Sequence, residues 1–330
     1  MTKKNILISR AILAVIMFCA AISVRLPSSA HEPFALELKE YPMLSQHAIK
    51  NAAPREKIIH VNEKKITEIP VPVPVPVPEK IDFEYVAKNI FLADPRTKFL
   101  ESDIDVQEFL EKNFSFEKNF SAPQILIFHA HSMEMFADST DDPMTGVFGV
   151  GKYLADVLQN EFGLRTLHHT ERFDVVDGIP QRQGSYERLE PSIRKILADN
   201  PSIEMVIDLH RDGVGAHVAP MVTEINGKRT AQIMFVNGLQ RRYRNGEILP
   251  VTWLENPYRR ENLAFSFNLQ LAANNLYPGF ARRIYLLEYR YSLHMVPRSI
   301  LLEVGAQNNT FQEALNAVFP IAKVIASVVS

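Results

Sequence analysis

Four polar side chains that could bind a metal ion and carry a proton lie within or just after short apolar runs. His131 and Glu134 follow the run ILIF, and His210 follows the run MVIDL. Glu303 stands near the end of a third run, SILLEV. Zn²⁺ takes imidazole nitrogens and carboxylate oxygens, and a catalytic zinc site has three protein ligands and one open position. The pattern therefore predicts a zinc site in which the first three side chains bind the metal and Glu303 acts as general base and acid.

The spacing of these residues is weak evidence when each is taken alone. The motif H-x-x-E arises by chance in many chains, and a histidine at the end of a strand most often has a structural role. The prediction rests instead on three separate runs that each supply such a residue. Polar neighbours extend the set, because His129 precedes His131, and the pair Arg211 and Asp212 follows His210.

The elements expected around these residues bring them together. Apolar runs typical of buried strands alternate with stretches of helical periodicity, which predicts an α/β domain with a mostly parallel sheet flanked by helices. In such a sheet, ligands bind outside the carboxyl ends of the strands, so the three runs would deliver their polar residues to one edge. The expected strands cover residues 124–128, 164–168, 204–209, 231–236, 281–288 and 299–304, and the expected helices cover 145–162, 182–198, 256–277 and 309–328.

The sequence pattern of residues 1–30 predicts that the chain is exported from the cytoplasm. Lys3, Lys4 and Arg10 precede an unbroken apolar run of 14 residues, AILAVIMFCAAISV. A membrane-spanning helix needs about 20 apolar residues, so a cleaved signal peptide and a retained signal anchor both stay open, with a soluble amphipathic helix as a third interpretation. The small residues that end at Ala30 favour cleavage. Either export interpretation places the rest of the chain outside the cytoplasm, anchored to the cell membrane or secreted.

Three further segments follow the leader. Residues 31–80 predict a disordered, proline-rich stalk, because a polar stretch leads into PVPVPVPVP, which is typical of a polyproline II rod. The rod would hold a domain off a membrane, or it would be a motif for a proline-binding module. Residues 81–121 predict a small helical segment in which Asp105 caps a short helix. Residues 122–330 carry the predicted catalytic domain.

The composition excludes several classes of protein. The 330 residues include 36 Lys and Arg against 38 Asp and Glu, and this net charge of -2 gives no support to a nucleic-acid binder. The one cysteine, Cys19, excludes a disulfide within the chain and any cysteine-rich zinc or iron–sulfur site. A basic cluster, Arg241–Arg244 with Arg259 and Arg260, would face an anionic polymer or form a solvated face.

Several segments resemble the stage II sporulation protein P family. They are ILIFHAHSMEMF, QGSYERLEPSIRKIL, NPSIEMVIDLHRDGV and SILLEVGAQNNTFQEA, and the motifs occur in the family's order. The resemblance implies the fold of the zinc-dependent N-acetylmuramoyl-L-alanine amidases. It implies hydrolysis of the amide that joins muramic acid to the peptide stem of peptidoglycan, and some members are also described as cleaving peptide cross-links. It further implies a role in spore engulfment with partners in the membrane.

The resemblance also implies roles for particular residues. The three predicted zinc ligands match the metal-binding residues of the related amidases, and Glu303 in LLEVG matches the catalytic glutamate of their L-x-E-x-G motif. By the same resemblance, His129 would orient the site. Arg211 and Asp212 in the motif HRD would bind substrate or support the metal ligands.

Two other functions stay open. A zinc carboxypeptidase also uses H-x-x-E with a distant histidine, and it would need an arginine such as Arg188 or Arg211 to hold a terminal carboxylate. A wall-binding protein that has lost catalysis is the second alternative. The presence of Glu303 argues against it, because a protein that only binds would not need a proton carrier.

Overall fold

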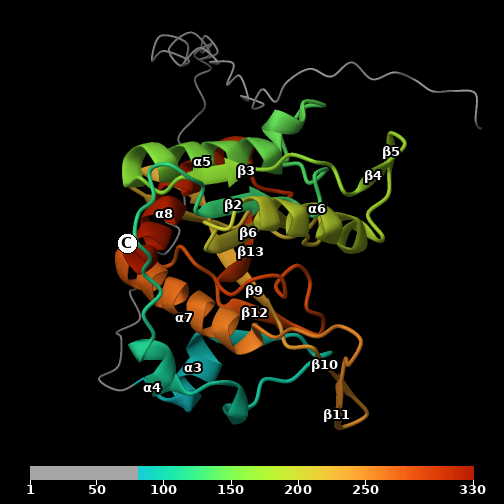
Figure 1. Cartoon of the computed structure of the whole chain (residues 1–330), viewed down its shortest axis with the longest axis vertical. Helices are drawn as coiled ribbons and strands as arrows, with labels where there is room; N and C mark the ends of the chain where they lie inside the picture. Colours follow the sequence, from blue (N-terminus) through green and yellow to red (C-terminus); the bar gives the residue numbers. More distant parts are fainter. Residues whose placement is uncertain (1–80) are drawn as a thin grey trace, which may run out of the picture. The chain divides into compact units, whose positions relative to one another are not determined.

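A seven-stranded sheet organises the described part of the chain, residues 81–330 of the computed structural model (Figure 1). The strands lie in the order β1-β12-β9-β13-β6-β2-β3. Neighbouring strands are parallel, except that β13 runs antiparallel to β9. The predicted α/β fold with a mostly parallel sheet is therefore confirmed. The strands are β1 (Phe91–Ala93), β2 (Ile125–Phe128), β3 (Thr166–His168), β6 (Met205–Asp212), β9 (Ile233–Gly238), β12 (Ile284–Leu287) and β13 (Ser299–Ala306).

The predicted leader and stalk, residues 1–30 and 31–80, lie outside the described residues. Within residues 81–330, the helix α8 (Phe311–Val329) is long and apolar enough to cross a membrane by length and composition. However, 56% of its apolar window is buried inside the protein. It packs against α5 (Val147–Phe162) and α7 (Arg259–Leu276), so we interpret it as a core helix of the domain.

The two faces of the sheet are covered differently. The long helices α5, α7 and α8 pack on one face and share a hydrophobic core with strand residues such as Ile127. Successive side chains of a strand point to opposite faces, so Phe128 packs on the other face with residues of α6 (Ser185–Asp199). Beyond α6, that second face is covered by the segment after β12, which packs through Leu293. A site on the second face would therefore be covered by α6 and by the segment that follows β12.

Residues 81–121 belong to the same core. Figure 1 shows α3 (Phe83–Asn89) and α4 (Val106–Glu111) on the side of α7, and Phe109 of α4 is fully buried. As predicted, Asp105 caps the short helix α4, because its side chain accepts a hydrogen bond of 3.0 Å from the backbone of Glu108. The strand β1 was not predicted. It pairs with β12 and extends the sheet at its edge.

Three short antiparallel hairpins project from the sheet and its loops, and none was predicted. They pair β4 with β5, β7 with β8, and β10 with β11. Their turns are Asp-Gly or Asn-Gly pairs in which both residues have positive φ, the conformation that a two-residue hairpin turn requires. The strands are β4 (Val175–Val176), β5 (Ile179–Pro180), β7 (Val222–Ile225), β8 (Lys228–Ala231), β10 (Arg241–Arg244) and β11 (Glu247–Pro250).

Candidate active site

The structure brings the four predicted residues to one pocket of about 490 Å³. β6 lies between β2 and β13 in the sheet, and Glu303 is the register partner of His210. The alternation of side chains along both strands puts these two residues on the face that α6 and the following loop cover. His131 and Glu134 lie in the loop that continues from β2.

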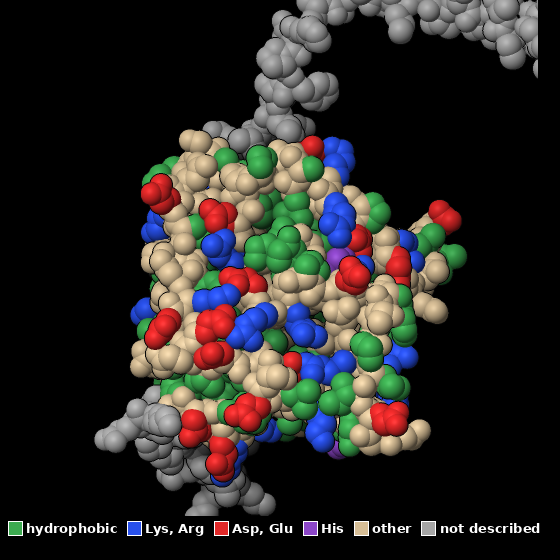
Figure 2. Space-filling model, turned by 60° about the horizontal axis from the view of Figure 1, so that its bottom comes forward, with side chains coloured by type: hydrophobic (Ala, Val, Ile, Leu, Met, Phe, Trp, Pro, Cys, Tyr) green, Lys and Arg blue, Asp and Glu red, His purple; other side chains and the backbone are tan. Residues whose placement is uncertain are grey.

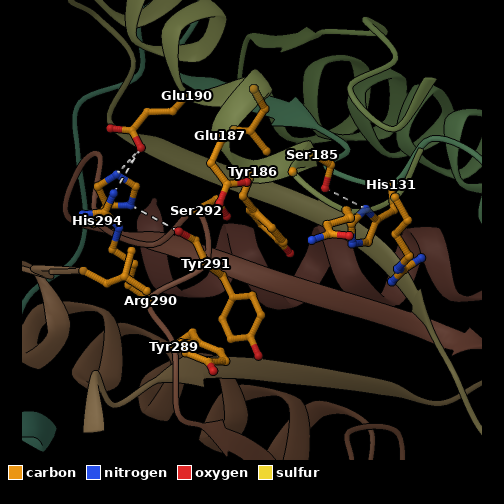
Figure 3. Close-up of a pocket in the computed structure, with 15 residues that line it drawn as sticks. His131, Ser185, Tyr186, Glu187, Glu190, Tyr289, Arg290, Tyr291, Ser292 and His294 are labelled. Carbon is orange, nitrogen blue, oxygen red and sulfur yellow. Dashed lines mark hydrogen bonds and ion pairs between the residues drawn. The ribbon is translucent and has the colours of Figure 1, made fainter. Parts of the chain in front are cut away.

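His131 is buried, and one nitrogen holds its ring in place. Nδ1 lies 2.8 Å from the carbonyl oxygen of Ala130 and 3.2 Å from Oγ of Ser185 (Figure 3). A carbonyl oxygen only accepts hydrogen bonds, so Nδ1 carries the hydrogen of the neutral ring. Burial, together with the charge on His210, lowers the pKa of His131 to about 4. The lone pair of Nε2 is therefore available to bind a cation.

Glu134 and His210 form a buried ion pair. Oε2 of Glu134 lies 3.1 Å from Nδ1 of His210 and accepts a hydrogen bond of 3.0 Å from the backbone of Arg211, while Oε1 accepts one of 2.9 Å from Arg182. Burial opposes both charges. Attraction between oppositely charged groups outweighs it, lowering the pKa of Glu134 to about 2 and raising the pKa of His210 well above its usual value. Glu134 is therefore ionised at neutral pH, as a metal ligand must be.

Asp208 holds the other nitrogen of His210. Its Oδ1 lies 2.7 Å from Nε2 of His210 and accepts a hydrogen bond of 2.9 Å from the backbone of Ala130. Its Oδ2 accepts a hydrogen bond of 2.7 Å from the hydroxyl of Ser292. Burial opposes the charge on Asp208, but His210 and these donors lower its pKa. Metal-binding histidines commonly have such a carboxylate on the nitrogen that does not bind the metal.

The donor set fits zinc in its chemistry, although its members do not face a common point. No group of three His, Cys, Asp or Glu side chains within residues 81–330 has the spacing of a formed metal site. Glu134 and His210 bond to each other instead, and the ring centroids of His131 and His210 are 5.2 Å apart. The residue types, two imidazoles and one ionised carboxylate, are nevertheless those that zinc takes. His210 is bonded at both nitrogens, so its Nδ1 would have to release its proton to bind a metal.

Glu303 has a buried carboxyl oxygen in a pocket that other charged side chains line. Its Oε2 is buried and has no hydrogen-bond partner among residues 81–330. Burial, and to a smaller extent the carboxylates of Glu134 and Asp212, raise the pKa of Glu303 to about 8, although the charge on His210 opposes the shift. A general acid or base is most effective when its pKa lies near the working pH. This environment suits a residue that takes up and releases a proton.

His129 turns toward α5 rather than toward the predicted ligands. Its Nδ1 lies 2.8 Å from the carbonyl oxygen of Leu209, and its Nε2 lies 2.8 Å from Nε2 of His168. A Cβ atom added to Gly151 of α5 would lie 2.7 Å from each of these two Nε2 atoms, so this helix passes close to the pair. Any effect of His129 on the site therefore passes through the backbone next to His210.

The two arginines expected to contact substrate donate hydrogen bonds to backbone carbonyl oxygens of the protein itself. Arg188 donates three hydrogen bonds of 2.5 to 3.0 Å to carbonyl oxygens of the loop that precedes α6. Arg211 donates one of 3.0 Å to the carbonyl of Met135, and Asp212 accepts one of 2.8 Å from Arg282. Arg211 and Asp212 still line the pocket. Arg188 is outside it, because its guanidinium is used to shape the loop.

Three residues of the site were missed by sequence reasoning. Asp208 left a usable signal, because it interrupts an apolar strand two residues before His210 and so shares its face. Arg182, which pairs with Glu134, left none. Tyr186, whose ring lies edge-on to His131 at 5.5 Å, stands in the family-like segment QGSYERLEPSIRKIL, but nothing there singled it out. Both come from the region where the hairpin loop leads into α6, and only the folded chain shows how close they come.

A second pocket of about 590 Å³ adjoins the first. The two share His131, Arg182, Tyr186 and Tyr291 in their walls. Figure 3 shows this second pocket, with its side chains supplied by the start of α6 and by the segment that follows β12. The candidate site is therefore continuous with a larger groove that could hold an extended substrate.

The basic cluster does not form one charged surface. Arg241 is buried in an ion pair with Asp103, and Arg260 pairs with Glu108. On the face that Figure 2 shows, basic, acidic and hydrophobic side chains are interspersed among the described residues.

Comparison with known families identifies the chain's relatives. The family model described as Stage II sporulation protein P matches residues 36–326. The chain belongs to this family. A curated relative, Stage II sporulation protein P of Bacillus subtilis (strain 168), is 23% identical over 209 residues, which cover 58% of this chain and 48% of the relative. The chain thus spans about half the length of the curated relative that it matches, and the predicted family resemblance is confirmed.

Solved structures with a similar fold include two amidases. N-acetylmuramoyl-L-alanine amidase AmiC2 of Nostoc punctiforme has a TM-score of 0.38 and 13% sequence identity, covering 64% of this chain and 97% of its own. The CwlD amidase from Clostridioides difficile, in complex with the GerS lipoprotein, has a TM-score of 0.36 and 15% identity, covering 62% of this chain and 99% of its own. Membership of the sporulation family rests on the sequence match and is independent of these structures.

Proposed function

We propose that this protein is a peptidoglycan hydrolase of the zinc-dependent N-acetylmuramoyl-L-alanine amidase type, which cleaves the amide between muramic acid and L-alanine. The observation that carries the proposal is the meeting of four side chains at adjacent strand ends in a member of the Stage II sporulation protein P family. They are His131, Glu134, His210 and Glu303.

The first three of these side chains would hold the metal. His131 would bind through Nε2, because its Nδ1 is held by Ala130, and His210 through Nδ1, because its Nε2 is held by Asp208. Glu134 would supply the carboxylate. Bound zinc supplies Lewis-acid chemistry, which lowers the pKa of a coordinated water and polarises a carbonyl group.

Glu303 would move the proton during hydrolysis. It would take a proton from the attacking water and donate it to the amide nitrogen of L-alanine as the bond to the lactyl carbonyl breaks. Its raised pKa, about 8, allows both roles near neutral pH, because neither the acid nor its conjugate base is strongly favoured.

The two arginines suggested for a carboxypeptidase, one in α6 and one in β6, give that alternative no support. A carboxypeptidase needs an arginine that grips a terminal carboxylate, and the two residues suggested for that role are Arg188 and Arg211. Both use their guanidinium groups on backbone carbonyls. An amidase acts within a polymer and needs no such grip.

The cellular setting of the proposal comes from the family and the leader. The enzyme would work outside the cytoplasm on peptidoglycan, anchored to the membrane by its N-terminal segment, or secreted if the leader is cleaved. It would act in spore engulfment with other wall-remodelling membrane proteins. Cleavage of peptide cross-links would be an additional activity.

A digest of purified peptidoglycan tests this function. The full chain, kept in solution with a mild detergent, is incubated with peptidoglycan in the presence of zinc or of a chelator, and the released products are identified by mass spectrometry. We expect intact stem peptides with a free L-alanine amine and glycan without stems, lost with the chelator. Release of terminal amino acids alone would show a carboxypeptidase, and bound zinc with no product would favour a wall-binding protein.

A further inference from the structure

An exposed tryptophan stands close to the groove. Trp253 is the single tryptophan of the chain and is 65% exposed, in the segment that follows the β10–β11 hairpin. Single exposed apolar side chains are common on proteins, so the surroundings of this indole, and not its exposure, indicate a role in binding. The neighbouring residue, Leu254, lines the 590 Å³ pocket, and the indole is linked to the pocket through Arg242 and Tyr289, of which Tyr289 lines it.

The indole is part of an ordered stack. The guanidinium of Arg242 lies 5.3 Å from the ring centroid of Trp253 and 5.1 Å from that of Tyr289, a distance at which a cation is attracted to each ring. Arg242 also donates a hydrogen bond of 2.5 Å to the hydroxyl of Tyr289 and pairs with the buried Glu288 at 3.4 Å. The stack is therefore held in place before any ligand arrives, which reduces the entropy lost on binding.

The aromatic surface continues from this stack to the proton carrier. Tyr289 and Tyr291 both line the 590 Å³ pocket (Figure 3), and Tyr291 also lines the pocket that contains Glu303. The backbone of Tyr289 crosses directly over Gly238, where an added Cβ would lie 1.8 Å from its carbonyl oxygen. The glycine thus lets the segment pass close to the sheet.

We infer that Trp253, Arg242 and Tyr289 form a stacking platform that binds the glycan strand of peptidoglycan beside the active site. The inference rests on the proposed function. Pyranose rings present flat arrays of C–H bonds that pack on aromatic faces, while their hydroxyl and acetamido groups need polar partners. The platform offers both kinds of contact. The glycan strand runs past every scissile amide, so it must lie across the rim of the groove while one stem enters the site.

The positive charge of Arg242 also suits the glycan product of the proposed hydrolysis. Hydrolysis of the amide leaves a free carboxylate on the lactyl group of each muramic acid. Arg242 and Arg244 share the single carboxylate of Glu288, so this group keeps a positive charge that attracts the new carboxylate. The platform would therefore retain the strand after one cut, which brings the next stem toward the active site.

Intrinsic fluorescence tests the platform directly, because Trp253 is the only indole. The full chain in mild detergent, without zinc, is titrated with a tetramer of N-acetylglucosamine and, separately, with free stem peptide. We expect a saturable change in emission with the tetramer alone. Since no catalysis is involved, this result does not depend on whether the protein hydrolyses peptidoglycan. A change with the stem peptide alone, or with neither probe, would overturn the inference.

A variant separates the platform from the rest of the protein. We expect Trp253→Ala to weaken binding of the tetramer, measured by calorimetry, by about tenfold or more. Tyr153→Ala is the matched control, because Tyr153 is an exposed aromatic residue on α5, away from the groove, and should leave the affinity unchanged. Equal affinities for all three proteins would contradict the platform. If digestion occurs but Trp253→Ala digests polymeric peptidoglycan at the wild-type rate, the platform fails while the amidase proposal stands.

Discussion

At the scale of single residues, each histidine of the site has one ring nitrogen bonded to a neighbouring oxygen, which fixes the orientation of the ring. His131 is held from behind by a backbone carbonyl, and His210 by the carboxylate of Asp208. In both rings the other nitrogen is left to face Glu134 or the pocket. The partner behind the ring fixes its orientation, so it influences metal affinity without touching the metal.

Asp208→Asn should weaken zinc binding by about 10- to 100-fold, because the amide keeps the shape of the side chain but loses the charge that supports His210. Zinc affinity can be measured by competition with a coloured chelator on the full chain. Asp174→Asn is a suitable control, since Asp174 is also buried but bonds Ser132 and not a predicted ligand. Equal zinc affinity of Asp208→Asn and wild type would contradict the role of Asp208.

Glu303→Gln should change how the stability of the zinc-free protein depends on pH. The folded pKa of about 8 lies above the ordinary value of 4.5, so across this range the folded state keeps a proton that the unfolded chain has released. The stability that this proton contributes is present below about pH 4.5 and is lost as the pH rises through about 8.

The variant lacks this titration, so it should become more stable relative to wild type between about pH 5 and about pH 8. Urea unfolding with a chelator present measures the difference in free energy of unfolding at each pH. A difference that stays constant across the range would show that Glu303 titrates normally in the fold.

Sequence reasoning predicted the residues of the site better than their contacts. Residue type and position after a strand were enough to single out His131, Glu134, His210 and Glu303. The same reasoning misplaced Arg188, because whether a guanidinium faces a ligand or a backbone carbonyl depends on a loop whose path is set by tertiary packing. Arg182 was missed for the same reason.

At the scale of elements, strands and long helices were predictable because their hydrophobic periods are set by burial. β6 and α5 begin and end within a few residues of their expected positions. The hairpins were missed although their Asn-Gly and Asp-Gly pairs are a typical sequence signal for a two-residue hairpin turn. β1 was missed because three residues at a sheet edge are too few to show a period.

Gly305 shows how one element end positions the site. It follows Glu303 by two residues, has φ of 63°, and an added Cβ would lie 2.8 Å from Oδ1 of Asn309. That Oδ1 accepts a hydrogen bond from the backbone of Ala306, which ends β13. The glycine thus allows the irregular backbone within β13, where the pairing with β6 shifts register between Glu303 and Ala306.

Gly305→Ala should destabilise the fold by more than Gly227→Ala. Both glycines have positive φ, which an alanine adopts at a cost of about 1 kcal/mol, but Gly227 lies in open space at a hairpin tip. The additional clash with Asn309 should raise the loss at Gly305 to about 2–4 kcal/mol. Urea unfolding of both variants measures the difference, and equal losses would mean that the turn relaxes freely around the new methyl group.

At the scale of the whole described region, one hydrophobic core joins the early helices to the sheet. Val86, Ile90, Phe91 and Phe109 are buried together with residues of α7 and α8. The sequence predicted residues 81–121 as a helical segment before the catalytic domain. Its apolar residues are too few for a core of their own, and they are buried against the larger domain instead.

Phe109→Ala should therefore destabilise the catalytic domain itself, by about 3–5 kcal/mol, because it leaves a cavity in the shared core. Calorimetry of the variant should show a single unfolding transition at a lower temperature, with loss of zinc binding in the same transition. Leu110→Ala is the matched control, since the adjacent Leu110 is exposed and should change stability little. A separate early transition that leaves the sheet intact would show that residues 81–121 fold independently.

We propose that Glu303 carries the proton in a zinc-dependent hydrolysis of peptidoglycan. The most direct test measures zinc content and the initial rate of stem-peptide release on the same samples of wild type and Glu303→Gln. We expect equal zinc content and a rate that falls by about 10²- to 10⁴-fold, the usual contribution of a general acid–base group. A variant that holds zinc and releases stems at the wild-type rate would show that Glu303 does not carry the proton.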